Sequence, residues 1–399
     1  MRIEVSGPEF LAAVEGAAAA TARRPLSPVM ANVLLAAQDG KVTVRGADNE
    51  LGVTRVVADG VAVIEDGVEL VDPVKVISTV KLHGERFVIG PGNAGAGLDI
   101  VVTNDAGRVK VRGGILGMAD SEVAKFPVRR VKEYPTEARV DAVALAKLLK
   151  GVAWSAEQKM EVTRTEKGDR EMKLKGVALS ARGGKLMAEA MDGHRYAAAT
   201  VDLADGAATD GFGVLLPLKA VTVLLESLDV GGVVIRADRP RDAGGGFEAE
   251  GAEFVLNGGQ MGKGFPNMAG HVPKGWDGEF AVDAGELLTA IRTAQVCGDT
   301  AMAELSAVDL TCGDGLVVVE WANGASVGRA EVAADCSGED VKVRTSPLFL
   351  VDFLRTFPKG GRVGLRLCHD EKKPMVLVDG DDRFFMCSQV TDRYGATNA

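Results

Sequence analysis

Apolar and polar residues alternate over short stretches through most of the chain. The runs at 41–44 and 316–319 show this pattern, and each directly follows an Asp-Gly pair, at 39–40 and 314–315. An Asp-Gly pair readily adopts the positive φ angles that a tight hairpin requires. Most of the chain is therefore expected to form antiparallel strands joined by hairpins.

Helical spacing of apolar residues appears in six short blocks of two kinds. In the first kind, a short strand ends at a valine, and apolar residues follow five and nine positions later. The three copies are Val5, Phe10 and Val14, then Val140, Leu145 and Leu149, then Val282, Leu287 and Ile291. They lie 135 and 142 residues apart. Each predicts a strand followed by a helix with one apolar face.

The second kind of block begins with a proline, which suits the first turn of a helix. Apolar residues follow one, four and seven positions later. The copies are Pro73 with Val74, Ile77 and Val80, Pro217 with Leu218, Val221 and Leu224, and Pro347 with Leu348, Val351 and Leu354. Together the two kinds predict helices at 8–24, 72–82, 141–154, 217–228, 283–296 and 346–359.

The two kinds of helix alternate, and the pair recurs about every 138 residues. This predicts an α+β protein of three similar domains, each with two helices on small antiparallel sheets. Phe-Pro pairs at 126–127 and 265–266 mark equivalent positions near the ends of the first two domains. The expected domains are 1–134, 135–274 and 275–390, followed by a tail at 391–399. The alternative is a chance similarity between amphipathic helices of an ordinary α+β protein.

The composition is that of a folded protein, with 399 residues, 46% of them hydrophobic and 26% charged. No run approaches the roughly 18 apolar residues of a membrane helix. The start of the chain lacks the basic end and long apolar run of a secretory signal. The cysteines are too far apart for a CxxC metal or redox site: Cys297, Cys312, Cys336, Cys368 and Cys387. These features predict reduced thiols and a cytoplasmic location.

The net charge of −10 argues against a protein that coats nucleic acid with a basic surface. The six expected helices differ from the rest of the chain, because they sum to +2 and most of their carboxylates belong to first turns. Their basic residues are candidates for DNA contact: Arg23, Arg24, Lys75, Lys81, Lys147, Lys150, Lys219, Arg292, Arg355 and Lys359. The alternative is that lysine and arginine occur late in helices for dipole reasons alone.

Three segments resemble one family, the bacterial DNA polymerase III β subunit, or sliding clamp. They are Arg24-Pro25 with 32–35, the run Met-Asp-Gly-His-Arg-Tyr-Ala at 191–197, and Gly-Phe-Pro at 264–266 running on to 272–274. The resemblance covers roughly residues 1–390. It implies the DNA clamp fold, in which two protomers close head-to-tail into a ring, each forming half of it.

The resemblance also implies a function. The chain is expected to be a processivity factor that encircles duplex DNA, with no catalytic residue, metal or cofactor. The implied partners are double-stranded DNA held by topology, a second copy of the chain, the DNA polymerase III α subunit, the clamp loader and other proteins with a clamp-binding motif, and no membrane. Arg24 coincides with a family residue that reaches the duplex, whereas the other basic residues are assigned by helix position.

A peptide pocket is implied at the junction of the middle and last domains. Its wall would be Leu174, Met191, Gly193, His194, Arg195, Tyr196, Pro266, His271, Val272, Pro374, Phe384, Phe385, Met386, Cys387, Ser388 and Gln389. An apolar slot would bind leucine and phenylalanine anchors, and a few polar groups would orient the peptide. The alternative for the Asp-Gly-His-Arg run is a plain hairpin turn without a partner.

The sequence departs from the family at the pocket. Most clamps end in a Met-Pro-Met-Arg-like segment, where this chain has Met-Cys-Ser-Gln-Val at 386–390. His271 stands where an apolar residue is commoner, and 161–171 is a longer, charged stretch in place of a compact loop. A specialised or inhibitor-resistant paralogue with an altered pocket, or a decoy that does not encircle DNA, therefore remains an alternative.

Enzyme functions find little support. The stretch at 90–95 matches GxGxxG, but a strand-like run at 98–102 follows it, whereas a dinucleotide site requires a helix there. The four histidines lack metal-ligand spacing. A hydrolase based on Asp192 and His194 would require a nucleophile, and no nucleophile elbow accompanies them.

Overall fold

The structure is a computed structural model of the whole chain. It describes residues 1–389 apart from 23–24, 26, 84–85, 92–97, 104–108, 116–119, 129–131, 157–162, 166–167, 171–175, 229, 240–244, 262–264, 297–306 and 324–325. Among the described helices, none combines the length and apolar character needed to cross a membrane.

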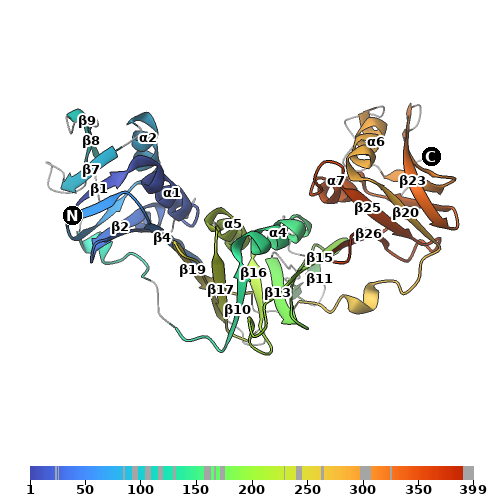
Figure 1. Cartoon of the computed structure of the whole chain (residues 1–399), viewed down its shortest axis with the longest axis horizontal. Coiled ribbons are helices and arrows are strands. Elements are labelled where there is room, and N and C mark those ends of the chain that lie inside the picture. Colours follow the sequence, from blue (N-terminus) through green and yellow to red (C-terminus); the bar gives the residue numbers. More distant parts are fainter. Residues whose placement is uncertain are drawn as a thin grey trace. The chain divides into compact units, whose positions relative to one another are not determined.

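Six helices occur where the two repeated blocks predict them (Figure 1). They are α1 (Gly7–Ala18), α2 (Pro73–His83), α4 (Ala142–Val152), α5 (Leu218–Ser227), α6 (Ala284–Val296) and α7 (Pro347–Leu354). A short helix that the sequence pattern did not predict, α3 (Asp120–Val123), adds one turn. Three 3₁₀ turns are η1 (Pro28–Ala31), η2 (Ala153–Ser155) and η3 (Ala269–His271).

Aspartate side chains cap α4 and α6. The Asp141 Oδ1 accepts the N–H of Ala144 at 3.0 Å, and the Asp283 Oδ1 accepts the N–H of Glu286 at 2.9 Å. Each bond satisfies an N–H that has no partner within its helix. The expected ends were wrong at two helices, because α1 stops at Ala18 rather than 24 and α7 at Leu354 rather than 359. Arg355 and Lys359, predicted within the last helix, therefore follow α7.

Antiparallel strands make up most of the remaining structure. They are β1 (Arg2–Ser6), β2 (Val33–Gln38), β3 (Lys41–Ala47), β4 (Leu51–Val57), β5 (Val61–Glu65), β6 (Gly67–Val71), β7 (Arg86–Pro91), β8 (Leu98–Thr103), β9 (Val109–Ile115), β10 (Thr136–Asp141), β11 (Thr163–Thr165), β12 (Gly168–Arg170), β13 (Gly176–Arg182), β14 (Lys185–Met191), β15 (Arg195–Asp202), β16 (Gly213–Pro217), β17 (Gly232–Ala237), β18 (Gly246–Glu250), β19 (Phe254–Gly259), β20 (Gly278–Asp283), β21 (Val308–Gly313), β22 (Leu316–Asn323), β23 (Ser326–Gly338), β24 (Val341–Thr345), β25 (Arg362–Leu367), β26 (Met375–Asp379) and β27 (Arg383–Cys387).

Both Asp-Gly pairs form the predicted hairpins. Asp39 and Gly40 have φ angles of 50° and 73° between β2 and β3, and Asp314 and Gly315 have φ angles of 49° and 77° between β21 and β22. The strands on each side pair in register, so the positive φ angles fall at the turn itself. The GxGxxG stretch begins in β7, its residues 92–95 lie outside the described residues, and the next described element is β8, which pairs antiparallel with β7.

The chain divides into two compact units. The first unit comprises residues 1–146 and 204–263. It contains a five-stranded sheet in the order β5-β1-β7-β8-β9 and an eight-stranded sheet in the order β10-β17-β18-β19-β4-β3-β2-β6. The pairing of β19 with β4 joins segments about 200 residues apart in the sequence into one sheet.

The second unit comprises residues 147–203 and 264–399. Its sheet runs in the order β13-β14-β15-β27-β26-β25-β20-β23-β22-β21-β24, and β11 and β12 form a separate hairpin. Here β27 pairs with β15, in the same manner as β19 with β4. The first residues of β10 and β20 lie within four residues of the two predicted domain boundaries. The division into three domains stays a prediction.

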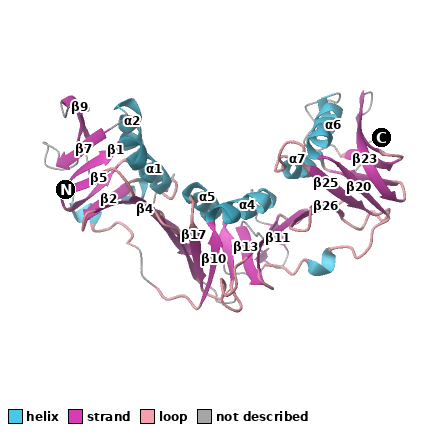
Figure 2. Ribbon diagram, viewed as in Figure 1, coloured by secondary structure: helices cyan, strands magenta, loops and turns pink. Residues whose placement is uncertain are grey.

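The α1, α5 and α6 helices pack against strands of their own unit (Figure 2). The α1 helix crosses β3 at Gly46, where an added Cβ would lie 1.8 Å from the Ala17 carbonyl oxygen. The α6 helix crosses β23 at Gly328, where a Cβ would lie 2.2 Å from the Ala294 carbonyl oxygen. Ala17 and Ala294 occupy the same position in the repeated block, so both helices approach their sheets through a glycine.

Candidate functional site

A groove of about 830 Å³ lies in the second unit. It is formed by the β14–β15 hairpin, the segment around η3, the loop before β26 and the end of β27. The lining residues are Met191, Gly193, His194, Arg195, Tyr196, Pro266, Met268, Gly270, His271, Val272, Pro273, Lys274, Glu371, Lys372, Lys373, Pro374, Met386, Cys387, Ser388 and Gln389. Strand alternation places apolar residues of β15, β26 and β27 on one side of the sheet, and the irregular segments form the rim.

The floor of the groove is apolar. Tyr196 and Met386, which face each other across the β15–β27 pair, are 4% and 6% exposed. They form a cluster with Val376, against which Met191 and Val272 pack. A concave apolar floor with few polar groups is typical of a site that binds small apolar side chains of a ligand.

The Asp-Gly-His-Arg run forms the hairpin turn between β14 and β15. Gly193 has a φ of 95°, and the Asp192 Oδ1 accepts the N–H groups of both His194 and Arg195 at 3.0 Å. The turn thus follows the plain hairpin geometry that Asp-Gly favours. Its side chains nevertheless form one wall of the groove.

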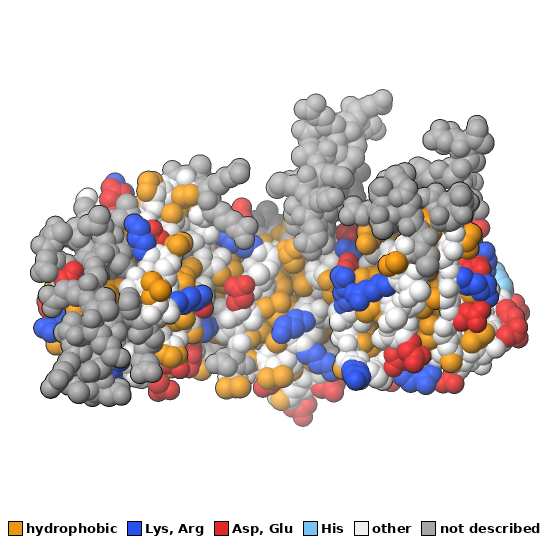
Figure 3. All heavy atoms as spheres, turned by 90° about the horizontal axis from the view of Figure 1, so that it is seen from above, with side chains coloured by type: hydrophobic (Ala, Val, Ile, Leu, Met, Phe, Trp, Pro, Cys, Tyr) orange, Lys and Arg blue, Asp and Glu red, His pale blue; other side chains and the backbone are white. Residues whose placement is uncertain are grey.

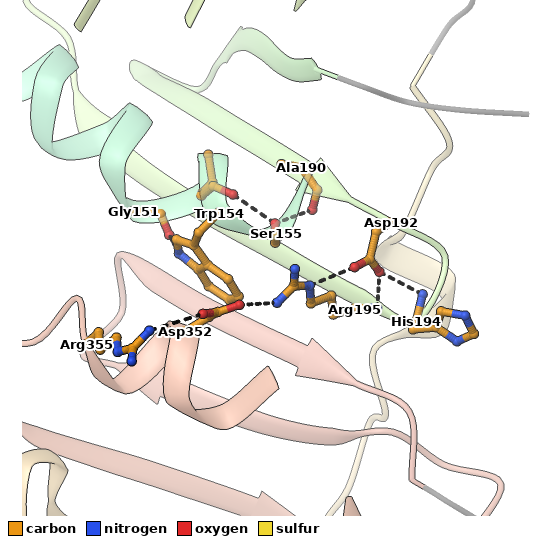
Figure 4. Close-up of polar contacts among 10 residues, drawn as sticks. Gly151, Trp154, Ser155, Ala190, Asp192, His194, Arg195, Asp352 and Arg355 are labelled. Carbon is orange, nitrogen blue, oxygen red and sulfur yellow. Dashed lines mark hydrogen bonds and ion pairs between the residues drawn. The ribbon is translucent and has the colours of Figure 1, made fainter. Parts of the chain in front are cut away.

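The Arg195 guanidinium lies between two carboxylates (Figure 4). Its Nε donates to the Asp192 Oδ2 at 2.7 Å, and its Nη1 donates to the Asp352 Oδ2 at 2.6 Å. It also lies over the rings of Trp154 and Phe349, 5.5 and 5.2 Å from their centroids. The side chain is only 11% exposed. Its charge is balanced by the two carboxylates before any ligand binds.

A buried hydrogen bond supports Tyr196. The Tyr196 hydroxyl donates to the Glu189 Oε1 at 2.6 Å. Burial raises the pKa of Glu189, although the bond from Tyr196 and the charge of Arg182 act in the opposite direction. Burial and the hydrogen bond to Glu189 also raise the pKa of Tyr196. Tyr196 therefore stays neutral and contributes a fixed apolar ring to the floor.

The end of β27 closes the groove. The backbone N–H of Ser388 donates to the His194 carbonyl at 3.0 Å, which ties the chain after β27 to the hairpin. The Gln389 Nε2 donates to the Lys373 carbonyl at 3.0 Å and holds the loop before β26. Cys387 is buried, and burial raises the pKa of its thiol to about 12, so the thiol stays protonated at neutral pH.

The groove brings together most residues of the predicted pocket. Leu174 lies outside the described residues. Phe384 and Phe385 belong to β27 but do not line the groove: Phe384 packs against Tyr196, and Phe385 is fully buried against Phe353. The remaining predicted residues all line it. Whether they bind a peptide stays a prediction.

Seven lining residues were not predicted: Met268, Gly270, Pro273, Lys274, Glu371, Lys372 and Lys373. Two of them could have been found, because Lys372 and Lys373 directly precede Pro374, which was predicted. Two adjacent lysines before a pocket proline stand out on an acidic protein and indicate a positively charged edge of the pocket. The remainder depends on how the segment around η3 folds over the sheet.

The basic residues proposed for DNA contact can be placed in part. Arg23 and Arg24 lie outside the described residues. The other eight are exposed: Lys75, Lys81, Lys147, Lys150, Lys219, Arg292, Arg355 and Lys359. Figure 3 shows lysine and arginine side chains as separate groups among apolar and neutral ones rather than one continuous basic patch. Such spacing suits weak contacts that do not fix a register.

Half of these eight residues have a carboxylate partner. The Lys81 ammonium lies 2.7 Å from Glu15, and Lys219 donates to Asp48 and to the Ala20 carbonyl. Weaker pairs of neighbouring residues join Lys75 to Asp72 at 3.6 Å and Arg355 to Asp352 at 4.0 Å. Lys147, Lys150, Arg292 and Lys359 form no ion pair with any described residue.

Within the described part of the chain, no group of three or more histidine, cysteine or carboxylate side chains could hold a metal ion. The arrangement around Asp192 and His194 is a backbone turn with a neighbouring ion pair. This turn forms one wall of the groove.

Comparison with known proteins gives consistent results. The profile described as "DNA polymerase III beta subunit, N-terminal domain" matches residues 1–88. The beta sliding clamp of Synechococcus elongatus is 24% identical over 340 residues, which are 83% of this chain and 84% of that protein.

Solved structures agree along nearly the whole chain. The DNA polymerase III beta subunit of Thermotoga maritima superposes with a TM-score of 0.82 at 19% identity, covering 98% of this chain and 99% of that one. The sliding clamp of Pseudomonas aeruginosa bound to griselimycin gives a TM-score of 0.82 at 20% identity, with the same coverage. The fold is therefore that of the DNA clamps, as the family resemblance implies.

Proposed function

We propose that this chain, a divergent member of the DNA polymerase III β subunit family, works as a DNA sliding clamp, a non-catalytic processivity factor that tethers a polymerase to duplex DNA. In this role the protein forms a ring around the duplex as a head-to-tail dimer. The groove in the second unit then binds peptide motifs of the replicative polymerase, the clamp loader and other partners.

The observation that supports a ring is the pattern of strand pairing. In the first unit β19 pairs with β4, and in the second unit β27 pairs with β15. By the internal repeat, β9 corresponds to β19 and β27, and residues 326–333 of β23 correspond to β4 and β15. Among the described strands, β9 pairs only with β8, and the 326–333 segment pairs only with β22.

A second copy supplies what one chain lacks. A strand edge with unpaired backbone groups favours pairing with another chain. One chain has one edge of each kind, so β9 of one protomer matches β23 of its partner, and the reverse. Two such heterologous contacts close a two-membered ring. Val327 on β23 and Val296 at the end of α6 are 66% and 76% exposed, and we propose that they lie in this interface.

The charges are suited to a protein that slides. A ring stays on DNA by topology, so its contacts with phosphates need only be weak and independent of sequence. Four exposed basic residues without a partner in the described structure, Lys147, Lys150, Arg292 and Lys359, are available for such contacts. The net charge of −10 disfavours binding of DNA elsewhere on the surface.

Light scattering on a sizing column over a concentration series tests the ring. A mass of about 83 kDa, twice the chain mass of 41.6 kDa, is expected at micromolar concentration. Retention on a nicked circular plasmid, compared with the same plasmid after linearisation, then tests topology. A protein that leaves both forms at the same rate, or that stays monomeric, would refute encirclement and favour the decoy alternative.

A further inference from the structure

Three lysines surround the apolar floor of the groove. Lys274 follows the η3 segment, and Lys372 and Lys373 belong to the loop before β26. All three are exposed, and none forms an ion pair with a described residue. We call them the rim lysines. Exposed lysines without a partner keep their charge available to a ligand.

The opposing charges at the groove are few. Among the described residues that line it, Glu371 is the single carboxylate. Asp370 lies next to it in sequence, and its Oδ1 accepts the N–H of Lys372 at 3.0 Å. The carboxylate of Asp192 is bound to Arg195. The lining therefore has a local excess of positive charge on a protein whose net charge is −10.

The loop with two of the rim lysines is fixed in place. The Gln389 Nε2 donates to the carbonyls of Lys373, Asp370 and Cys368 at 3.0, 3.4 and 3.4 Å. The N–H of Lys373 donates to the Asp370 carbonyl at 2.9 Å. A loop held at several backbone carbonyls presents its side chains at a defined side of the groove. Less conformational entropy is therefore lost when a ligand binds.

Arg195 is less suited than the rim lysines to bind an acidic ligand. Its guanidinium is bound by Asp192 and Asp352 and covered by aromatic rings. Its positive charge is already shared between those two carboxylates, so it attracts a ligand carboxylate less than an unpaired lysine does. Charge recognition in the groove therefore belongs to the rim lysines.

We propose that the groove selects partner peptides in which acidic residues flank the apolar anchors, and that Lys274, Lys372 and Lys373 are the residues that recognise those acids. This inference rests on the proposed function, because it concerns the peptides that the clamp would bind. The apolar floor contributes affinity, and the rim lysines contribute selectivity and a faster encounter.

Fluorescence anisotropy with the full chain and two labelled hexapeptides tests the proposal. One peptide is Gly-Asp-Leu-Glu-Leu-Phe and the other is its neutral isostere, Gly-Asn-Leu-Gln-Leu-Phe. At 20 mM NaCl the acidic peptide is expected to bind about tenfold more tightly, and at 500 mM NaCl the two affinities should converge, because exposed charges are screened. Both peptides keep the same apolar anchors, so the difference isolates charge.

A triple variant, Lys274→Gln, Lys372→Gln and Lys373→Gln, should bind the two peptides equally and keep the wild-type affinity for the neutral one. A matched variant, Lys41→Gln, Lys125→Gln and Lys342→Gln, removes the same charge from exposed lysines outside the groove and should retain the preference. Retention of the preference by the rim variant, or its loss in the matched variant, would overturn the assignment.

The outcomes separate the two proposals. Equal binding of both peptides by the wild type would overturn the acidic preference and leave the peptide groove standing. No binding of either peptide would count against the groove as the partner site. A chain ending at Gln389 that binds both peptides equally and more tightly than the full chain would make the protein's own tail the occupant, which would also overturn the proposal.

Discussion

Arg195 and Asp352, 157 residues apart in the sequence, form a 2.6 Å ion pair that joins the groove to α7. Arg195 is also bound to Asp192 in its own hairpin, so one guanidinium connects the turn, the groove wall and the helix (Figure 4). Arg355 lies 4.0 Å from the same Asp352. The wall of the groove is thus held by a network of ion pairs that depends on Arg195.

Replacing Arg195 tests this role. We expect Arg195→Gln to lower the free energy of unfolding by about 2 kcal/mol, because the largely buried Asp192 and the half-buried Asp352 lose their common partner. Peptide affinity should fall with it, since the turn at 192–195 loosens. Urea unfolding and anisotropy measure the two effects.

A double-mutant cycle identifies the partner. If the pair is energetically coupled, Arg195→Gln combined with Asp352→Asn should cost less than the sum of the single changes. Arg355→Gln serves as control, because that side chain is exposed and its contact with Asp352 is long. Additive single losses would mean that Arg195 acts without Asp352.

Glu189 makes stability depend on pH. Burial raises its pKa above the unfolded value, so the folded protein binds this proton more tightly than the unfolded chain does. This contribution to stability is complete below the unfolded pKa and is lost as the pH rises through the folded pKa. Glu189→Gln should therefore be more stable than the wild type at pH 7, by up to about 1 kcal/mol, and not at pH 4.

The hydrogen bond to Tyr196 survives that change, because a glutamine carbonyl also accepts it. Unfolding in urea at several pH values gives the comparison. Glu253→Gln is the control, since Glu253 lies in a turn of the other unit, and its difference from the wild type should not follow this course. A Glu189→Gln advantage that is the same at pH 4 and pH 7 would argue against titration of Glu189.

Gly46 is required where α1 crosses β3. An alanine Cβ would lie 1.8 Å from the Ala17 carbonyl oxygen, which belongs to the backbone and cannot turn aside. We expect Gly46→Ala to lower the free energy of unfolding by about 2 to 3 kcal/mol. Gly232→Ala is the matched control, because no atom lies within 4 Å of its added Cβ. Urea unfolding of both variants with equal midpoints would contradict this packing.

Local signals predicted the fold well. The prolines that begin α2 and α7, the caps Asp141 and Asp283, and the Asp-Gly turns all act within a few residues of themselves. The ends of α1 and α7 were predicted too far along the chain. The sequence after each helix remains compatible with a helix in composition, but the helices end at Ala18 and Leu354.

The groove was harder to predict. Its floor depends on the pairing of β15 with β27, about 190 residues apart, and that register places Phe385 on the opposite side from Tyr196 and Met386. Nothing local to Arg195 indicates that Asp352 neutralises it. Side chains that meet through long-range pairing are known only once the sheet order is known.

The edge of β23 tests dimer formation. Val327→Glu places a charge at an edge that we propose pairs with β9 of the partner, so a dimer should dissociate at micromolar concentration while the monomer keeps its fold. Val230→Glu is the control, because Val230 is 76% exposed but lies before β17, away from both proposed edges. Light scattering gives the mass and circular dichroism the fold. A Val327→Glu protein that remains dimeric would exclude this edge from the interface.

The free basic residues should matter most for DNA. Lys147, Lys150 and Arg292 have no ion-pair partner in the described structure, whereas Lys219 is bound to Asp48 and to the Ala20 carbonyl. Changing each of the three to glutamate should therefore weaken DNA retention strongly at low salt, and the variant should show a shallower salt dependence.

Lys219→Gln should weaken retention much less, because its charge is already balanced within the protein. The combined change Lys41→Glu, Lys125→Glu and Lys342→Glu, at exposed lysines outside the proposed DNA-contacting set, alters the net charge by the same amount as the triple variant and is the control. Retention on nicked circular DNA between 20 and 200 mM NaCl gives the comparison. Wild-type retention by the triple variant at low salt would show that these residues do not face the duplex, and an equal loss from Lys219→Gln would show that internal pairing does not decide which cations contact DNA.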